Sequence, residues 1–162
     1  MRATASRVAV LAWLTLLVGC DHVTKVAAKV ELEGQRPREL VRGVLDLRYA
    51  ENTDVAFNLL RWVQVGIRTP VLIVVGALAL LSLTWVLLRR PQDNLLKRIA
   101  FLLITAGAAG NYLDRVARGY VIDFVHLHHW PVFNVADAYV LVGAVMLGVV
   151  AMSVRRAGQS PS

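Results

Sequence analysis

Four segments of this sequence approach the roughly 20 apolar residues that an α-helix needs to cross a bilayer. The segment 70–88 contains no ionisable residue, which makes it the clearest of the four. The composition agrees, because 57% of the 162 residues are hydrophobic, against about 45–50% in an ordinary soluble domain. We therefore expect a single membrane domain over residues 1–162, with transmembrane helices at about 8–30, 70–88, 96–113 and 135–154.

The basic residues indicate the direction of these helices. They precede the first segment, fill the short loop between the second and third, and follow the last, at Arg2, Arg7, Arg89, Arg90, Lys97, Arg98, Arg155 and Arg156. Short loops rich in lysine and arginine remain in the cytoplasm. We therefore expect both termini on the cytoplasmic side and the long loop 31–69 outside. The same placement accounts for the net charge of +7, and we expect no nucleic-acid partner.

The loop 31–69 has a pattern of its own. In GVLDLRYAEN, at 43–52, apolar residues alternate with Asp46 and Arg48, which is the period of a strand with one apolar face. Residues 59–67 then predict a short interfacial helix, because arginine and tryptophan at Arg61 and Trp62 suit headgroup depth. The predicted fold class is a membrane all-α protein with four helices, a small outer β element and this short helix.

Polar side chains occur near the outer ends of the predicted membrane helices. They form pairs whose members are three or four residues apart, Asp21 with Lys25, Asn111 with Asp114, and Asn134 with Asp137. A charge at membrane depth costs about 2.5–3.5 kcal/mol on insertion scales, so such groups usually face protein or water and mark function. Each spacing places both members on one helix face. Small residues would let the third and fourth helices approach closely, at Ala106, Gly107, Ala108, Ala109, Gly110, Gly143, Ala144 and Gly148.

Two carboxylates differ from the other acids. No lysine or arginine lies within one helical turn of Asp123 or Asp137 in the sequence, and their neighbours are mostly apolar. Two carboxylates that lie close together in apolar surroundings share one proton near neutral pH. Such a pair can hold a water molecule, remove its proton during attack on a carbonyl, and return that proton to the leaving amine. The pattern favours peptide hydrolysis by two aspartates.

Other interpretations of the charged residues stay open. Asp21 with Lys25, and Asp114 with Arg115 or Arg118, could be structural ion pairs. A small proton-coupled transporter subunit is an alternative function, but a proton relay needs polar groups through the whole depth of the membrane. A non-catalytic assembly factor is a third possibility. The apolar segment 70–88 and the gathering of acids on one side argue against the relay.

Four blocks follow one another along the chain: DHVTK at 21–25, NTDVAF at 52–57, AGAAGNYLDR at 106–115, and VIDF at 121–124 with PVFNVAD at 131–137. In this order they resemble the lipoprotein signal peptidase family, the type II signal peptidases of bacteria. The resemblance covers nearly the whole chain, and GNYLDR, VIDF and FNVAD are specific in combination. It implies a four-helix aspartic peptidase of the inner membrane, with a β-cradle and an active site near the outer face. Such an enzyme cleaves a prolipoprotein just before a cysteine that carries diacylglyceryl.

The resemblance also assigns roles by matching position. Asp123 and Asp137 match the catalytic dyad, while pocket-lining and supporting residues are matched by Asp21, Asn52, Asn111, Arg115, Asn134, Lys25 and Asp114. It implies no cofactor and no metal, with prolipoprotein and membrane lipid as partners, and we expect a monomer. Two positions depart from the family pattern, since Asp54 replaces a usual glycine and Ala106 a common one.

Two further motifs have competing interpretations. His126, His128 and His129 could bind a metal together with Asp123, although an aspartate dyad needs none. LVGC at 17–20 looks like a lipoprotein cleavage motif that ends in Cys20. Cleavage there would remove half of the first helix and leave three long apolar spans, so we expect Cys20 to be a packing residue in an uncut helix.

Overall fold

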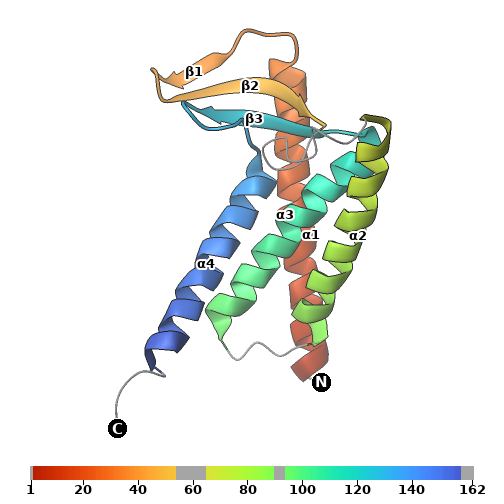
Figure 1. The fold of residues 1–162 in the computed structure, drawn as a ribbon, viewed down its shortest axis with the longest axis vertical. Helices are drawn as coiled ribbons and strands as arrows, with labels where there is room; N and C mark the ends of the chain where they lie inside the picture. Colours follow the sequence, from red (N-terminus) through yellow and green to blue (C-terminus); the bar gives the residue numbers. More distant parts are fainter. Residues whose placement is uncertain (1, 54–64, 90–93, 158–162) are drawn as a thin grey trace.

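The computed structural model describes residues 2–53, 65–89 and 94–157 of the chain. In order these form α1 (Arg2–Leu32), β1 (Arg38–Val41), β2 (Leu45–Asn52), α2 (Val65–Arg89), α3 (Leu95–Arg118), β3 (Val121–Leu127) and α4 (Val135–Ala157). The long helices run side by side and the strands lie across one end of them (Figure 1). The start of α1, the end of α2, the start of α3 and the end of α4 all lie at the opposite end.

Three of the predicted spans are confirmed as helices that are long and apolar enough to cross a membrane. They are Arg7–Leu32 in α1, Thr69–Leu88 in α2 and Val135–Ser153 in α4. The predicted segment 96–113 is helical too, within α3, but α3 is not among these three. Its apolar sequence is diluted by Lys97 and Arg98 at one end and by Asn111 near the other.

The position of α3 explains its lower hydropathy. It packs against each of α1, α2 and α4, so it is the central helix of the described bundle. A helix surrounded by protein does not need an apolar face toward lipid on every side. Asp114 on this helix is accordingly only 2% exposed, although it carries a charge.

Glycines let α3 approach its neighbours closely, as the small-residue pattern predicts. A Cβ atom at Gly107 would collide with the backbone carbonyl oxygen of Ala136, and one at Gly110 would collide with the carboxylate of Asp21. The prediction is confirmed at these two positions. It is wrong for Gly148, where an added Cβ would meet no described atom within 4 Å. Gly143, near the middle of α4, lies in close contact with Ala100 and Ile104 of α3.

The contrast between these glycines gives a stability prediction. Gly107→Ala should lower the free energy of unfolding by about 1–3 kcal/mol, because the methyl group forces α3 and α4 apart. Gly148→Ala should leave it unchanged or slightly higher, since alanine favours the helix and meets open space. Thermal unfolding of the purified proteins in detergent, followed by circular dichroism, compares the two. Equal stability of Gly107→Ala and the wild type would contradict the close contact.

The strands form one antiparallel sheet in the order β1-β2-β3. β2 confirms the strand predicted from the alternation at 43–52. The third strand is β3, in which Asp123 pairs with Ala50 of β2. The local sequence pattern does not predict β3, because its partner strand β2 lies far earlier in the chain. Most of the interfacial helix predicted at 59–67, with Arg61 and Trp62, falls outside the described residues, and so does Asp54.

Candidate active site

Asp123 is held by amides from two different elements. The residue lies in β3 with only 2% of its surface exposed. Its Oδ2 accepts a hydrogen bond from Nδ2 of Asn52, the last residue of β2, at 2.9 Å. Its Oδ1 accepts one from Nδ2 of Asn134, just before α4, at 2.6 Å. Both oxygens of this buried carboxylate therefore have an amide donor.

Asp137 is fixed by the start of α4. Its backbone N–H donates to Oδ1 of Asn134 at 3.0 Å, and its own Oδ2 accepts from the backbone N–H of Asn134 at 3.2 Å. This reciprocal pair is a capping box, which satisfies N–H groups at the start of a helix. The sequence carries the signal for this cap, because Asn-x-x-Asp precedes an apolar run. The second oxygen, Oδ1, accepts from Nδ2 of Asn111 at 2.8 Å.

Asn111 and Asn134 connect the two carboxylates. Nδ2 of Asn134 lies 3.1 Å from Oδ1 of Asn111, so the chain of contacts runs from Asp123 through both amides to Asp137. The charge of Asp137 also acts on Asp123 directly. Two acids from distant parts of the sequence therefore lie within electrostatic range, with neutral donors between them.

A buried lysine anchors this chain of amides. Nζ of Lys25 donates to Oδ2 of Asp21 at 2.7 Å and to Oδ1 of Asn111 at 2.9 Å, and lies 2.9 Å from Oδ2 of Asp114. Asp21 and Asn111 thus accept hydrogen bonds from the ammonium group, and Asp114 pairs with its charge. Asp114 also forms an ion pair with Arg118 at 3.2 Å. The ion-pair interpretation is thus confirmed for Asp21 with Lys25 and for Asp114 with Arg118.

Asp21 has a second contact that links α1 to α4. Its Oδ1 accepts a hydrogen bond from the backbone N–H of Ala136 at 2.9 Å. Ala136 lies in the first turn of α4, where backbone N–H groups have no partner within the helix. Gly110 leaves space for this carboxylate, as described above. Asp21 therefore holds the helix end on which Asp137 stands.

Arg115 lies beside the same network. It is half-buried, and one guanidinium nitrogen, NH1, donates to the backbone oxygen of Asn111 at 3.1 Å. Its positive charge is close enough to interact with Asp137, Asp123 and Asp114. The network thus contains a second cation besides the buried Lys25. The guanidinium group of Arg115 is the one that lies near both Asp123 and Asp137.

The environment of Asp123 shifts its protonation. Burial raises the pKa of Asp123 from its ordinary value of 3.8 to about 6. The hydrogen bond from Asn52 opposes the rise, the negative charge of Asp137 adds to it, and the hydrogen bond from Asn134 opposes it again. A carboxyl group with such a pKa can exist in either form near neutral pH, as an acid–base catalyst requires.

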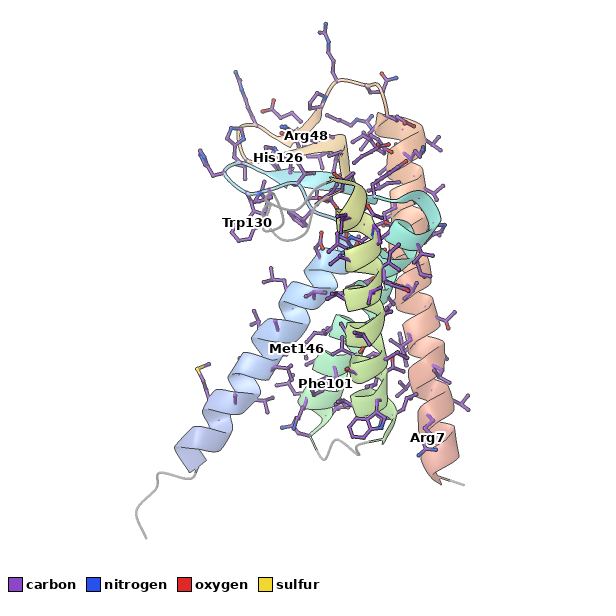
Figure 2. All side chains as sticks on the ribbon, turned by 45° about the vertical axis from the view of Figure 1, so that its right-hand side comes forward. Arg7, Arg48, Phe101, His126, Trp130 and Met146 are labelled. Carbon is purple, nitrogen blue, oxygen red and sulfur yellow. The ribbon has the colours of Figure 1, made fainter. Side chains whose placement is uncertain are left out.

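The histidines do not gather around Asp123. Nδ1 of His126 lies 3.0 Å from Oδ2 of Asp46, and Arg48 holds the same carboxylate with two nitrogens at 2.7 and 2.8 Å. Arg48 and His126 lie together on the sheet (Figure 2). The hydrogen bonds from Arg48 and His126 hold the pKa of Asp46 well below its usual range. Among the described residues, no group of three or more His, Cys, Asp or Glu side chains could hold a metal ion.

A separate cavity of about 650 Å³ lies between α1 and α3. Leu14, Val18 and Leu113 contribute to its mainly apolar wall, and Asp21 and Asp114 reach it from the network. Neither member of the aspartate pair lines this cavity. It therefore lies behind the network rather than at the place where the two carboxylates approach each other.

Cys20 lies within a continuous helix. α1 runs unbroken from Arg2 to Leu32, and the residue after Cys20 is the buried Asp21. Cys20 itself is exposed, so the expectation that it packs against other parts of the chain is wrong. Cleavage before Cys20 would separate the first half of α1 from the half that holds the network.

The comparison with known proteins now gives the family. The family model described as signal peptidase (SPase) II matches residues 13–153. The chain belongs to the signal peptidase II family. It is 36% identical to a lipoprotein signal peptidase of Syntrophotalea carbinolica, over 82% of this chain and 84% of that protein. It is 34% identical to a lipoprotein signal peptidase of Streptococcus pyogenes serotype M3, over 83% of this chain and 86% of that protein.

Solved structures have the same fold. One bacterial membrane enzyme, determined by the in meso method at 2.3 Å resolution, matches with a TM-score of 0.77 and 22% identity, over 95% of this chain and 93% of that one. A second, at 1.9 Å resolution, matches with a TM-score of 0.76 and 24% identity, over 88% of this chain and 92% of that one. The arrangement of helices and sheet is therefore that of a known membrane enzyme.

The nine predicted site residues of this chain meet in one connected network. It contains Asp123, Asp137, Asn52, Asn111, Asn134, Arg115, Lys25, Asp21 and Asp114. The residues come from α1, β2, α3, β3 and α4, all near the end of the bundle that carries the sheet. Their roles in a reaction stay predictions.

The pKa of Asp123 can be tested without an activity assay. Asn52→Leu removes the hydrogen bond that favours the charged carboxylate, so the pKa should rise above the wild-type value of about 6. NMR titration of carbon-labelled aspartate in the detergent-solubilised protein measures both values. Because the native pKa lies above 3.8, the stability gained from the protonated group is present at low pH and is lost as pH rises through about 6.

A neighbouring residue provides the control for this titration. Glu51 is exposed and accepts a hydrogen bond from the hydroxyl group of Tyr49. Glu51→Gln should leave the midpoint of Asp123 in place, since Glu51 is not among the groups that shift it. A midpoint that stays or falls in Asn52→Leu would show that the contact with Asn52 does not govern the charge of Asp123.

Proposed function

We propose that Asp123 and Asp137 are the catalytic dyad of an aspartic endopeptidase that cleaves a prolipoprotein before its diacylglyceryl-modified cysteine. Membership of the signal peptidase II family supports removal of signal peptides from prolipoproteins as its activity. The observation that carries the catalytic assignment is the pair of carboxylates joined by Asn111 and Asn134. No other pair of acids among the described residues combines electrostatic coupling with neutral donors on both members.

The unlike settings of the two carboxylates suggest their roles. Asp123 is buried on a strand, and burial raises its pKa to about 6, which favours its protonated form. In the proposed cycle it carries the proton that the pair shares. Asp137 accepts two hydrogen bonds in the first turn of α4, where a helix favours negative charge. Asp137 then removes a proton from the water that attacks the scissile carbonyl. Asp123 gives its proton to the carbonyl oxygen as the water adds. When the tetrahedral intermediate collapses, Asp137 passes the proton taken from that water to the leaving amine, and Asp123 recovers its proton from the hydroxyl group of the intermediate.

The amides and the arginine fit supporting roles in this reaction. Asn111 and Asn134 direct N–H groups toward the carboxylates, and the same donors can reach a substrate oxygen without adding charge. Arg115 carries positive charge near both aspartates, so it can stabilise negative charge that develops there or hold a substrate carbonyl. Lys25, Asp21 and Asp114 hold the helices in position and do not need to contact the substrate.

The proposal includes a specific membrane topology. α3 would be the fourth span, because a central helix can cross a bilayer with polar residues that its neighbours cover. The basic residues at the starts of α1 and α3 and at the ends of α2 and α4 lie on the side opposite the sheet and would be cytoplasmic. The site would then lie near the outer face of the bacterial inner membrane, in a monomer with residues 1–162 as one domain. This gathering at one depth also disfavours the proton-relay alternative, and a non-catalytic role is disfavoured by the dyad.

The dyad assignment predicts loss of cleavage. Asp123→Asn and Asp137→Asn should each reduce turnover of a diacylglyceryl prolipoprotein by at least about 100-fold, because acid–base catalysis requires both groups. Purified enzyme in detergent with a gel-shift assay of cleavage measures this, and thermal unfolding checks the fold. Asp46→Asn is the matched control, since Asp46 is a shielded carboxylate outside the network. Normal turnover in either Asp123→Asn or Asp137→Asn would show that these residues are not the catalytic dyad.

Recognition of the lipid gives a separate prediction. The unlipidated precursor should be a poor substrate, because acyl chains contribute burial of ~0.8 kcal/mol per CH₂ group when they leave water. Kinetics with precursors that carry shorter or longer acyl chains should show KM falling as the chains lengthen. Equal kcat/KM for the lipidated and unlipidated precursors would exclude lipid as part of what the enzyme recognises, while leaving the dyad untouched.

A further inference from the structure

The free end of the sheet is a distinct surface, which we call the sheet tip and define as residues 40–44 and 127–130. Two turns meet there. Val44 donates its backbone N–H to Val41 at 2.9 Å, and its backbone oxygen accepts from His128 at 2.9 Å. Trp130 donates its backbone N–H to Leu127 at 2.9 Å. The turn between β1 and β2 is therefore fixed to the turn that follows β3.

The sheet tip exposes large apolar side chains. The exposed fractions are between 38% and 53% for Leu40, Val41, Val44, Leu127 and Trp130. These residues lie at the same end of the sheet, where Leu45 pairs with both Val41 and Leu127. Large apolar side chains exposed together, and not scattered singly, are typical of an interaction surface.

The sheet tip lies where a bilayer surface would be. It extends outward over α4, away from the other helices (Figure 1). Trp130 lies level with the start of α4 (Figure 2). Only residues 131–134 separate Trp130 from Val135, the first residue of that helix, so the two are at most about 18 Å apart. Tryptophan at the end of a membrane helix typically occupies the headgroup layer.

The charges around the sheet tip are mainly positive. Arg38 and Arg42 are exposed, as are His128 and His129. The nearest acids are already engaged: Glu39 accepts a hydrogen bond from the backbone N–H of Gly43 at 2.8 Å, and Asp46 is bound by Arg48 and His126. Guanidinium groups match the geometry of phosphate oxygens.

We propose that the sheet tip is a docking surface for the anionic phospholipid headgroups of the outer leaflet. Trp130, Val41 and Val44 enter the headgroup layer, while Arg38 and Arg42 bind lipid phosphates. The proposal goes beyond peptide cleavage. It rests on the proposed function only in that the sheet is placed on the outer side of the membrane. Because β2 and β3 also carry Asn52 and Asp123, lipid binding at the tip holds the sheet over the site.

The test is quenching of Trp130 by brominated lipid. The full chain is placed in nanodiscs of phosphatidylcholine, or of phosphatidylcholine with phosphatidylglycerol, brominated near the headgroup end of the acyl chains. The chain has four tryptophans, so the difference between wild type and Trp130→Phe isolates the signal of Trp130. We expect quenching in both lipids and stronger quenching with phosphatidylglycerol. No cleavage is needed, so this result is independent of the dyad.

Charge variants give the specificity of this contact. Arg38→Gln with Arg42→Gln should remove the gain from phosphatidylglycerol, with docking weakened roughly five-fold per arginine. The matched control is Arg7→Gln with Lys97→Gln, which removes the same charge from exposed positions at the other end of the bundle and should keep the gain. If Trp130→Phe does not fold, a spin label at Val44→Cys in a Cys20→Ser background reports the same depth.

Three outcomes would overturn the proposal. Absence of quenching at Trp130 would mean that the tip does not reach the bilayer. Equal quenching with and without phosphatidylglycerol would mean that its arginines do not select anionic headgroups. If Trp130 is shielded from the brominated lipid only in nanodiscs that contain two chains, the sheet tip binds a second copy of the chain and not lipid headgroups.

Discussion

The buried ammonium group of Lys25 is the interaction on which the rest of the structure depends. It is 0% exposed and is surrounded by Asp21, Asn111 and Asp114. An isolated ammonium group would be very costly at this depth, but Lys25 is compensated by two carboxylates and one amide oxygen. Because Lys25 and Asp21 lie on α1 and their partners on α3, the bundle cannot separate these helices without leaving an unpaired buried charge.

This constraint reaches the aspartate pair through the backbone. Asp21 uses one oxygen for Lys25 and the other for the N–H of Ala136, so α1 holds the first turn of α4. Asp137 stands in that turn and is locked there by the capping box with Asn134. The position of one catalytic candidate is therefore set by an ion pair that does not touch it. Supporting residues of this kind fix geometry, which is what acid–base chemistry needs.

Much of this arrangement could be predicted from the sequence, and the limits have physical causes. Long apolar runs predict the helices, and polar pairs three or four residues apart identify six of the nine site residues. Asp123 is identified by its apolar neighbours. Asn52 and Arg115 could be assigned to the site only through the resemblance to the family. β3 could not be predicted, because its pairing with β2 is a long-range contact that leaves no local period. The low hydropathy of α3 likewise reflects packing on all sides. Gly148 shows that a small residue alone does not establish a close contact.

The two asparagines show why neutral amides suit this site. Oδ1 of Asn111 accepts from Lys25, which forces its Nδ2 toward Asp137. Oδ1 of Asn134 accepts from the N–H of Asp137, which forces its Nδ2 toward Asp123. Each amide is oriented by its oxygen and presents its donor to a carboxylate. An acid at either position could still accept those bonds but would repel the pair, and an apolar residue would leave buried donors and acceptors unsatisfied. The hydrogen bonds that Oδ1 of Asn111 and of Asn134 accept thus orient the Nδ2 donors toward the carboxylates before a substrate binds.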